Sequence, residues 1–161
     1  MSEAAPSRSR LASIALDEQS IAPSSSNIEH ERKVAIYDIL DSNHFELDGR
    51  DDGPYALHLS VAEDRLVLAV RLEEGDPIAT FVLSLSPLRR LMKDYFIVCD
   101  SYYQAIRTAP PSRIQAIDMG RRALHDDGSK LLVERLKGKI TVDHDTARRL
   151  FTLICALHWK G

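Results

Sequence analysis

Three Arg-Arg doublets are the residues of this chain best suited to binding chemistry: Arg89-Arg90, Arg121-Arg122 and Arg148-Arg149. A guanidinium offers a planar fork of N–H donors that matches a phosphate or a carboxylate. All three doublets lie in a basic half, since residues 86–161 hold 14 Lys/Arg against 8 Asp/Glu, whereas residues 1–85 hold 7 against 16. Converging doublets would form an anion site or a docking surface for an acidic partner. The alternative is solvated helix faces, or pairs with the acidic half, which stabilise little.

Helical spacing predicts where two of the doublets point. Arg89, Arg90 and Lys93 share the arc opposite the apolar stripe of their helix, and therefore face away from the core. Arg148 and Arg149 fall with Thr152 on the narrow polar arc of the last helix. Trp159 lies off the main apolar face of that helix, near the arc of Arg148. It is interpreted either as an interface anchor or as a cover for one edge of the core.

The densest polar stretch is residues 117–128, where Arg121, Arg122 and His125 fall within one helical turn. These three side chains could bind a phosphate, with His125 acting as an acid. Gly120 costs about 1 kcal/mol against alanine inside a helix, which suggests a close approach to its backbone. The alternative interpretation makes Gly120 a helix-packing contact and His125 a residue favoured by the helix dipole.

Other reactive residue types lack the spacing that chemistry needs. The six histidines form no H-x-x-x-H or H-x-H pair, so no metal site is predicted. Cys99 and Cys155 sit far apart in apolar helical patterns, which is typical of reduced structural cysteines. There is no G-x-S-x-G motif and no phosphate-cradling glycine loop, and no cofactor is predicted. Asp143-His144-Asp145 is interpreted as a helix-capping cluster rather than a catalytic relay. The balance favours a protein that is not an enzyme.

In the first half, residues 1–10 have too little apolar content to pack and are predicted to be a disordered tail. Leu11 to Leu16 could form a short strand, and Asn27 is predicted to cap a helix that ends near Asp41. Residues 44–52 are predicted to be a polar connection. Period-two alternation then predicts three antiparallel strands over residues 55–61, 66–72 and 78–85.

In the second half of the chain, apolar residues recur every three to four positions, which predicts helices. Ser86 at the N-cap and Pro87 at the first helical position predict a long helix that ends before Pro110-Pro111. A second helix is predicted to end near His125, because Asp126-Asp127-Gly128 should break it. The remaining predicted elements are a short helix from Ser129 to the C′ glycine Gly138, a strand over residues 139–142, and a last helix, capped by Asp145 or Thr146, through Trp159.

These elements predict an α+β fold, an antiparallel β-meander of three to five strands with helices packed mainly on one face. Residues 11–161 should form a single domain, in which residues 11–85 supply a helix plus the acidic meander and residues 86–161 the mainly helical, basic part. Twelve side chains are predicted to form its core: Leu57, Leu59, Leu66, Leu68, Phe81, Leu91, Tyr95, Val98, Leu150, Leu153, Ile154 and Leu157.

Several strings of this chain also carry a family resemblance. Ser-Pro-Leu-Arg-Arg (86–90), Asp-Met-Gly-Arg-Arg (118–122) and the run from Asp145 to Trp159 resemble an uncharacterised alphaproteobacterial protein family of about this length. The resemblance covers nearly the whole chain from about Leu11. It implies a cytoplasmic bacterial protein, and it transfers no activity, cofactor or residue role to this chain.

Three functions fit these observations. The first is a non-catalytic protein-interaction or regulatory module that uses the Arg-rich helix faces, with another protein or a second copy of the chain as partner. The second is binding, with or without turnover, of a small phosphorylated or carboxylated metabolite at Arg121, Arg122 and His125, joined by Glu29 and His30. The third is RNA binding through the basic half.

Two bulk properties limit the partners. The net charge of −3 argues against general nucleic-acid binding. The aromatic side chains of residues 95–103 could stack on bases, but their helical spacing favours core packing.

No apolar run approaches the roughly 20 residues that span a membrane, and the N-terminus lacks the apolar core of a signal peptide. We therefore expect a cytoplasmic protein with no membrane partner.

Overall fold

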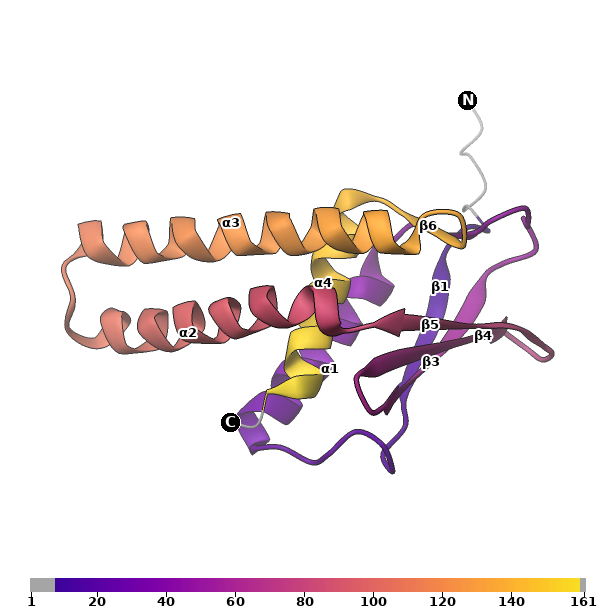
Figure 1. Cartoon of the computed structure of the whole chain (residues 1–161), viewed down its shortest axis with the longest axis horizontal. Helices are drawn as coiled ribbons and strands as arrows, with labels where there is room; N and C mark the ends of the chain where they lie inside the picture. The colour runs from indigo at the N-terminus through magenta and orange to yellow at the C-terminus, as the bar shows by residue number, and fades with distance from the viewer. Residues whose placement is uncertain (1–7, 160–161) are drawn as a thin grey trace.

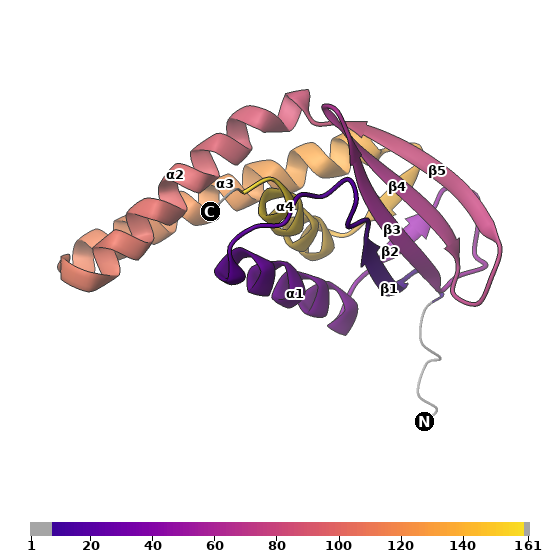
Figure 2. The same cartoon turned by 90° about the horizontal axis from the view of Figure 1, so that it is seen from below.

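The computed structural model describes residues 8–159, and it places four helices on one side of a curved sheet (Figures 1 and 2). This arrangement confirms the predicted α+β class. The elements in chain order are β1 (Leu11–Leu16), α1 (Ser26–Asp41), β2 (Phe45–Leu47), β3 (Tyr55–Ala62), β4 (Arg65–Leu72), β5 (Pro77–Ser84), α2 (Ser86–Thr108), α3 (Pro111–Leu136), β6 (Ile140–Val142) and α4 (His144–His158).

The main sheet has the strand order β1-β3-β4-β5. The three strands β3, β4 and β5 form the predicted antiparallel meander. The prediction of a purely antiparallel sheet is wrong, because β1 runs parallel to β3. The physical reason is α1, which carries the chain back along the sheet between the two strands, as a parallel pair requires.

Alternation along the meander places leucines on the face that the helices cover. Leu59 lies opposite Leu68, and Leu66 lies opposite Leu83, all of them buried. Nine of the twelve predicted core residues are buried, whereas Phe81, Leu91 and Val98 are only partly so. Phe81 lies on the edge strand β5, and the centre of the α2 stripe is formed by Leu88, Met92, Tyr95 and Cys99.

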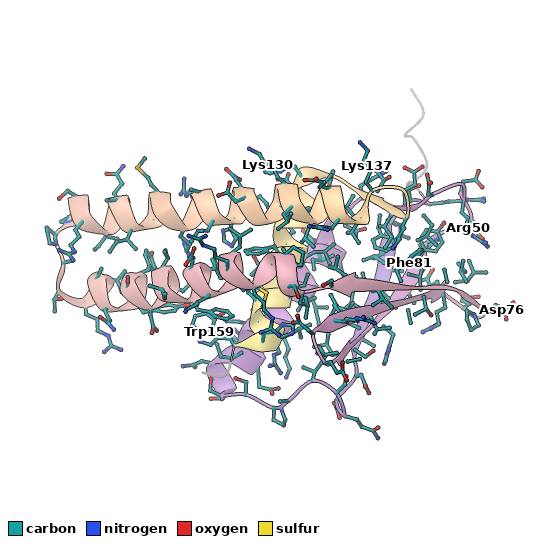
Figure 3. The ribbon with its side chains drawn as sticks, viewed as in Figure 1. Arg50, Asp76, Phe81, Lys130, Lys137 and Trp159 are labelled. Carbon is teal, nitrogen blue, oxygen red and sulfur yellow. The ribbon has the colours of Figure 1, made fainter. Side chains whose placement is uncertain are left out.

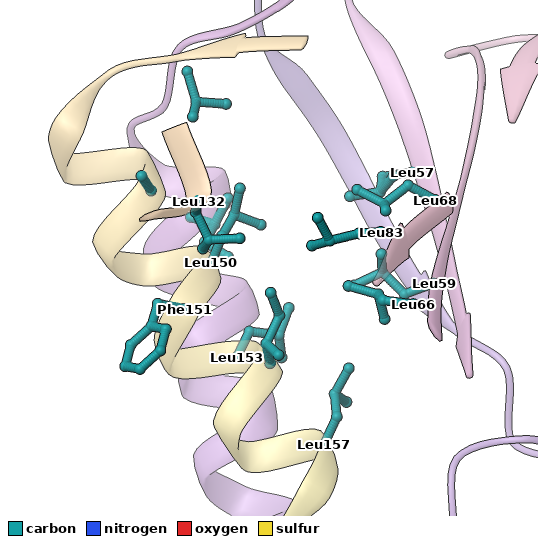
Figure 4. Packing of buried hydrophobic residues seen from close by; sticks show 14 of the residues in the cluster. Leu57, Leu59, Leu66, Leu68, Leu83, Leu132, Leu150, Phe151, Leu153 and Leu157 are labelled. Atoms are coloured by element: carbon teal, nitrogen blue, oxygen red, sulfur yellow. The ribbon is translucent and has the colours of Figure 1, made fainter. Parts of the chain in front are cut away.

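Helix α4 fills the space between the sheet and the other helices. Its side chains Leu150, Leu153 and Leu157 lie opposite the sheet leucines, and Phe151 points away from the sheet (Figure 4). Each such fully buried leucine contributes on the order of 1.5–3 kcal/mol. The apolar circumference of this helix, visible in its sequence, reflects contact with layers on more than one side.

Helices α2 and α3 form a long antiparallel hairpin that projects beyond the sheet (Figure 1). The predicted break at Asp126-Asp127-Gly128 is wrong, because α3 is continuous through it. Gly128 and Ser129 are buried there, and a Cβ at Gly128 would lie 2.5 Å from Cδ1 of Phe151. The glycine therefore permits close packing of α3 on α4 and does not end the helix.

The helix ends differ from the predictions by one or two residues. Helix α1 is capped by Ser25, whose hydroxyl accepts from the N–H of Ile28, rather than by Asn27. Ser86 is the first residue of α2, so its hydroxyl donates to Asp64 instead of capping the helix. Asp143 caps α4 by accepting from the N–H of Thr146. Gly138, with φ of 84°, follows α3 as predicted.

Two segments that the sequence leaves without structure take part in the fold. Residues 44–52 contain β2, which pairs antiparallel with β6. The N–H groups of Phe45 and Tyr55 donate to the carbonyls of Ser9 and Arg10, so the described end of the predicted tail contacts the sheet region. Residues 1–7 lie outside the described residues. Among residues 8–159, none of the helices has the combination of length and apolar content that crossing a membrane requires.

Candidate anion-binding site at the crossing of α3 and α4

The three Arg-Arg doublets do not share one surface. Arg89 and Arg90 line a hollow at the start of α2, and Arg148 and Arg149 line a different one on α4. Arg121 lies close enough to His125 to lower its pKa, as Arg148 does. The structure therefore brings one arginine of the second doublet, Arg121, and one of the third, Arg148, close to His125, and it leaves the first doublet apart.

The first doublet fits the interpretation of pairing with the acidic half. The Nε of Arg89 donates to Oδ1 of Asp64 at 2.6 Å, and the hydroxyl of Ser86 donates to Oδ2 of the same carboxylate at 2.6 Å. The Arg89 hydrogen bond lowers the pKa of Asp64. Arg90 and Lys93 are exposed on the same helix, as the helical spacing predicts. The contacts of Arg89 and Ser86 with Asp64 connect the start of α2 to the turn between β3 and β4.

The second doublet shares one carboxylate. Nη2 of Arg121 lies 2.5 Å from Oδ1 of Asp118, and Nε of Arg122 lies 3.1 Å from Oδ2. The Arg121 guanidinium also covers the ring of Tyr102, 4.7 Å from its centroid, a cation–π contact. The Nε of Arg121 is buried and has no hydrogen-bond partner among the described residues. The exposed Arg122 is thus engaged locally, whereas Arg121 is turned toward the protein.

His125 lies between α2 and α4. Its Nε2 is 3.1 Å from the hydroxyl oxygen of Tyr95 and 3.1 Å from Oγ1 of Thr152. Its ring packs against the rings of Tyr95 and Phe151, with centroids 4.8 and 6.3 Å away. Burial lowers the pKa of His125 to about 4, and the charges of Arg148 and Arg121 act in the same direction. The imidazole is therefore neutral at neutral pH.

The hollow beside His125 has a volume of about 300 Å³ and is lined by His125, Asp145, Arg148, Arg149 and Thr152. The Nε of Arg148 is buried and has no hydrogen-bond partner among residues 8–159. Nη1 of Arg149 donates to the carbonyl of Ser42 at 2.6 Å, which fixes this guanidinium against the end of α1. Two cations and a hydroxyl thus face a space large enough for a small molecule.

Asp145 gives the hollow a mixed character. It lies in the first turn of α4, where the helix dipole favours a carboxylate. A ligand with one anionic group and a hydroxyl or ammonium group would satisfy both the arginines and Asp145. Within residues 8–159, no three His, Cys, Asp or Glu side chains lie close enough together to hold a metal ion.

Trp159, Glu29 and His30 also lie outside this hollow. Trp159 is partly buried, and its ring packs on that of Phe96 with centroids 4.9 Å apart, which supports its role at an edge of the core. Glu29 accepts from the N–H of Ser24 at 3.1 Å and lies 3.5 Å from Arg32. His30 is exposed and lines a separate hollow between α1 and α2. Glu29 and His30 therefore do not join His125.

Sequence reasoning placed Thr152 on the polar arc of Arg148 and Arg149, but it missed the tyrosine on the inner side of the site. Tyr95 lies on the apolar stripe of α2, where its hydroxyl could not be assigned a role from periodicity. The basic hollow is centred on Arg148 and Arg149 rather than on Arg121 and Arg122.

The fold and the site define an α+β protein that carries a small basic hollow where two helices cross. The chain belongs to the uncharacterised protein family UPF0262, whose family model matches residues 8–160. This finding confirms the resemblance seen in the sequence.

Relatives of this family occur in several alphaproteobacteria. UPF0262 proteins of Rhodopseudomonas palustris (strain BisB5) and Nitrobacter winogradskyi are each 57% identical to this chain over 155 residues, which is 96% of this chain and 95% and 93% of theirs. A UPF0262 protein of Bradyrhizobium sp. (strain BTAi1 / ATCC BAA-1182) is 58% identical over 153 residues, 94% of this chain and 91% of its own. No solved structure matches the chain.

Proposed function

We propose that this protein binds the phosphate or carboxylate group of a small metabolite in the hollow beside His125. The observation that carries the proposal is the position of Arg148, whose Nε is buried and unpartnered among residues 8–159 while its side chain lines the same hollow as Arg149 and Thr152. A buried N–H without a partner costs free energy, and an oxyanion is the partner that suits a guanidinium best. The proposal concerns binding and assigns no reaction.

The surroundings support Arg148 and Arg149 as the binding pair. Arg149 is held in place by the carbonyl of Ser42, so its guanidinium loses little freedom when a ligand arrives. Arg122 is exposed and already shares Asp118 with Arg121, which makes it a weaker candidate. The arginines of the proposed site therefore lie on α4, whereas the sequence favoured the doublet on α3.

The first test is a calorimetric titration with inorganic phosphate, sugar phosphates and small organic acids. Arg148→Gln should weaken binding of the best of these anions by about 10- to 100-fold, because a charge-assisted hydrogen bond contributes about 1.5–3 kcal/mol. Arg113→Gln is the matched control, since Arg113 is exposed in the first turn of α3 and does not line the hollow. Equal affinities of the two variants, or no binding by the native chain, would contradict the proposal.

A second candidate function, protein binding, is supported by the hollow at the start of α2. It has a volume of about 700 Å³, and its lining combines the apolar side chains of Leu85, Met92 and Phe96 with three cations, two carboxylates and a histidine: Arg89, Arg90, Lys93, Glu63, Asp64 and His158. Such a surface suits a protein segment that combines apolar and acidic side chains. Arg90→Glu together with Lys93→Glu should abolish binding of an acidic, leucine-containing peptide probe, whereas Lys130→Glu on α3 should not.

A further inference from the structure

We propose that anion binding in the hollow beside His125 is coupled to the uptake of one proton by Nδ1 of this histidine, so that the ligand is bound more tightly as the pH falls. This inference rests on the proposed function and adds its regulation. Three features of the site carry it: the direction of the hydrogen bonds at Nε2, the position of Nδ1, and the charges around the ring.

The hydrogen bonds assign the proton of the neutral ring to Nε2. Thr152 has one hydroxyl proton, and it donates that proton to the carbonyl of Arg148 at 3.1 Å. The contact of 3.1 Å between Thr152 Oγ1 and His125 Nε2 then requires the histidine to donate. The oxygen of Tyr95 can accept from the same N–H. In the neutral ring, Nδ1 therefore carries a lone pair.

Nδ1 is the ring nitrogen that can meet a ligand. Among residues 8–159 it forms no hydrogen bond, and the histidine lines the hollow together with Arg148 and Thr152. A lone pair that faces an oxyanion repels it, whereas an N–H donates to it. Of the protonation states of the ring, only the imidazolium keeps the Nε2–H donor and also donates from Nδ1 to a bound anion.

Charged groups surround the ring from the helices packed around it. Arg121 on α3 and Arg148 on α4 disfavour its protonation, whereas Asp118 and Asp126 on α3 favour it. Asp145 on α4 lies across the hollow, and α2 contributes the hydroxyl of Tyr95. Burial is the main cause of the lowered pKa of His125, and the charge of Arg148 is the next. An anion bound by Arg148 would offset that charge, and its binding would therefore favour the imidazolium.

Linkage requires the effect to be reciprocal. In the free protein the pKa of His125 is about 4, and a bound anion raises it. Between the free and the bound pKa, each fall of one pH unit strengthens binding by up to tenfold. Above the bound pKa the affinity is independent of this group.

Sulfate is the probe that tests this coupling, because it keeps its charge throughout the range used. Titration calorimetry from pH 8 to pH 5, in buffers of different ionisation enthalpy, measures both the affinity and the protons taken up. We expect affinity to rise at least tenfold across this range, with uptake approaching one proton. In His125→Gln, sulfate should still bind through the arginines, with no proton uptake from this site.

Two further measurements separate the outcomes. His144→Gln, a substitution at a histidine in the first turn of α4 that does not line the hollow, should keep the pH dependence of the native chain. Nitrogen chemical shifts of His125 should show the Nε2–H tautomer without sulfate and the imidazolium with it. Sulfate binding without proton uptake, or with uptake that survives in His125→Gln, overturns the coupling and leaves the proposed function standing. No binding of sulfate or of the other anions overturns both.

Discussion

The guanidinium of Arg32 is the charged group most deeply built into the described part of this fold. The side chain is buried, with 6% of the residue's surface exposed. Its Nε donates to the carbonyl of Ala156 at 2.9 Å and its Nη2 to that of Leu157 at 3.3 Å, while Nη1 donates to Ala22 at 3.1 Å. It thereby satisfies carbonyls in the last turn of α4, where the helix dipole also favours a cation.

Replacing Arg32 should consequently destabilise the protein. Arg32→Leu keeps an apolar stem but leaves two carbonyls of α4 without their partner, so we expect a loss of about 2–4 kcal/mol in the free energy of unfolding. Urea unfolding measures this loss. Lys33→Leu is the control, because Lys33 is the exposed neighbour on α1. A loss below about 0.5 kcal/mol for Arg32→Leu would show that water replaces the guanidinium without cost.

His125 should make stability depend on pH. Its folded pKa of about 4 lies below the ordinary value of 6.5, so the folded state binds fewer protons than the unfolded chain between these two values. This group favours folding fully above pH 6.5, and that contribution is lost as the pH falls toward 4. Unfolding at pH 7 and pH 5 should show a larger decrease for the native chain than for His125→Gln. Parallel decreases would mean that the ring is not shielded as described.

Within the long helix α3, two glycines have opposite roles. Gly120 is exposed, and a Cβ added there would meet no atom of the rest of the fold within 4 Å, so its interpretation as a helix-packing contact is wrong. At Gly128 a Cβ would lie 2.5–2.6 Å from three ring atoms of Phe151. One glycine thus weakens the helix, and the other permits the crossing with α4.

Alanine substitution should separate these roles. Gly120→Ala should raise the free energy of unfolding by about 0.5–1 kcal/mol, because alanine restricts the unfolded chain and favours the helix. Gly128→Ala should lower it by about 1–3 kcal/mol through overpacking against Phe151, despite the same gain in helix propensity. Chemical denaturation of both variants provides the comparison. Changes of equal sign would contradict the assignment of the crossing to Gly128.

These two glycines also show how far the sequence determines the elements. The meander could be predicted because Leu57, Leu59, Leu66 and Leu68 alternate with less buried residues over short, local spans. The packing role of Gly128 within a continuous α3 could not be predicted, since its partner Phe151 is distant in sequence. Likewise β2 is three residues long and exists only because β6 pairs with it.

In the candidate site, too, local features could be predicted and contacts between distant segments could not. The Arg-Arg doublets could be found from residue type, and their outward direction from helical periodicity. Which doublets meet could not be predicted, because the approach of Arg121 and Arg148 to His125 depends on how α3 and α4 cross. The burial of the Arg32 side chain also could not be predicted, because its hydrogen-bond partners are backbone carbonyls, which carry no sequence signal.

The whole molecule has two ends of different character. At the sheet end, Arg50 and Asp76 project to solvent, while α2 and α3 extend toward the other end (Figure 3). The buried residues of α3 are Gly128, Ser129, Leu132 and Leu136, all in the half near the sheet. Its first half contacts mainly α2, and Met119 there is 65% exposed.

Backbone protection should therefore be uneven along α3. We expect amides of residues 114–122 to exchange with deuterium by local opening, well before those of residues 128–136, which should exchange close to the rate of global unfolding. Hydrogen exchange followed by mass spectrometry resolves these segments. Equal protection along the helix would indicate that the projecting end is stabilised by contacts other than those between α2 and α3.

The position of α4 between the sheet and the other helices has a consequence for folding during translation. During translation this helix leaves the ribosome after every element that it covers, because chain order is also the order of synthesis. Until then the leucines of the sheet and the inner side of α1 have no cover, and the contacts between α1 and α4 join segments more than 100 residues apart. Closure of the core is therefore a late event in the folding of the nascent chain, because it depends on contacts between segments that are distant in sequence.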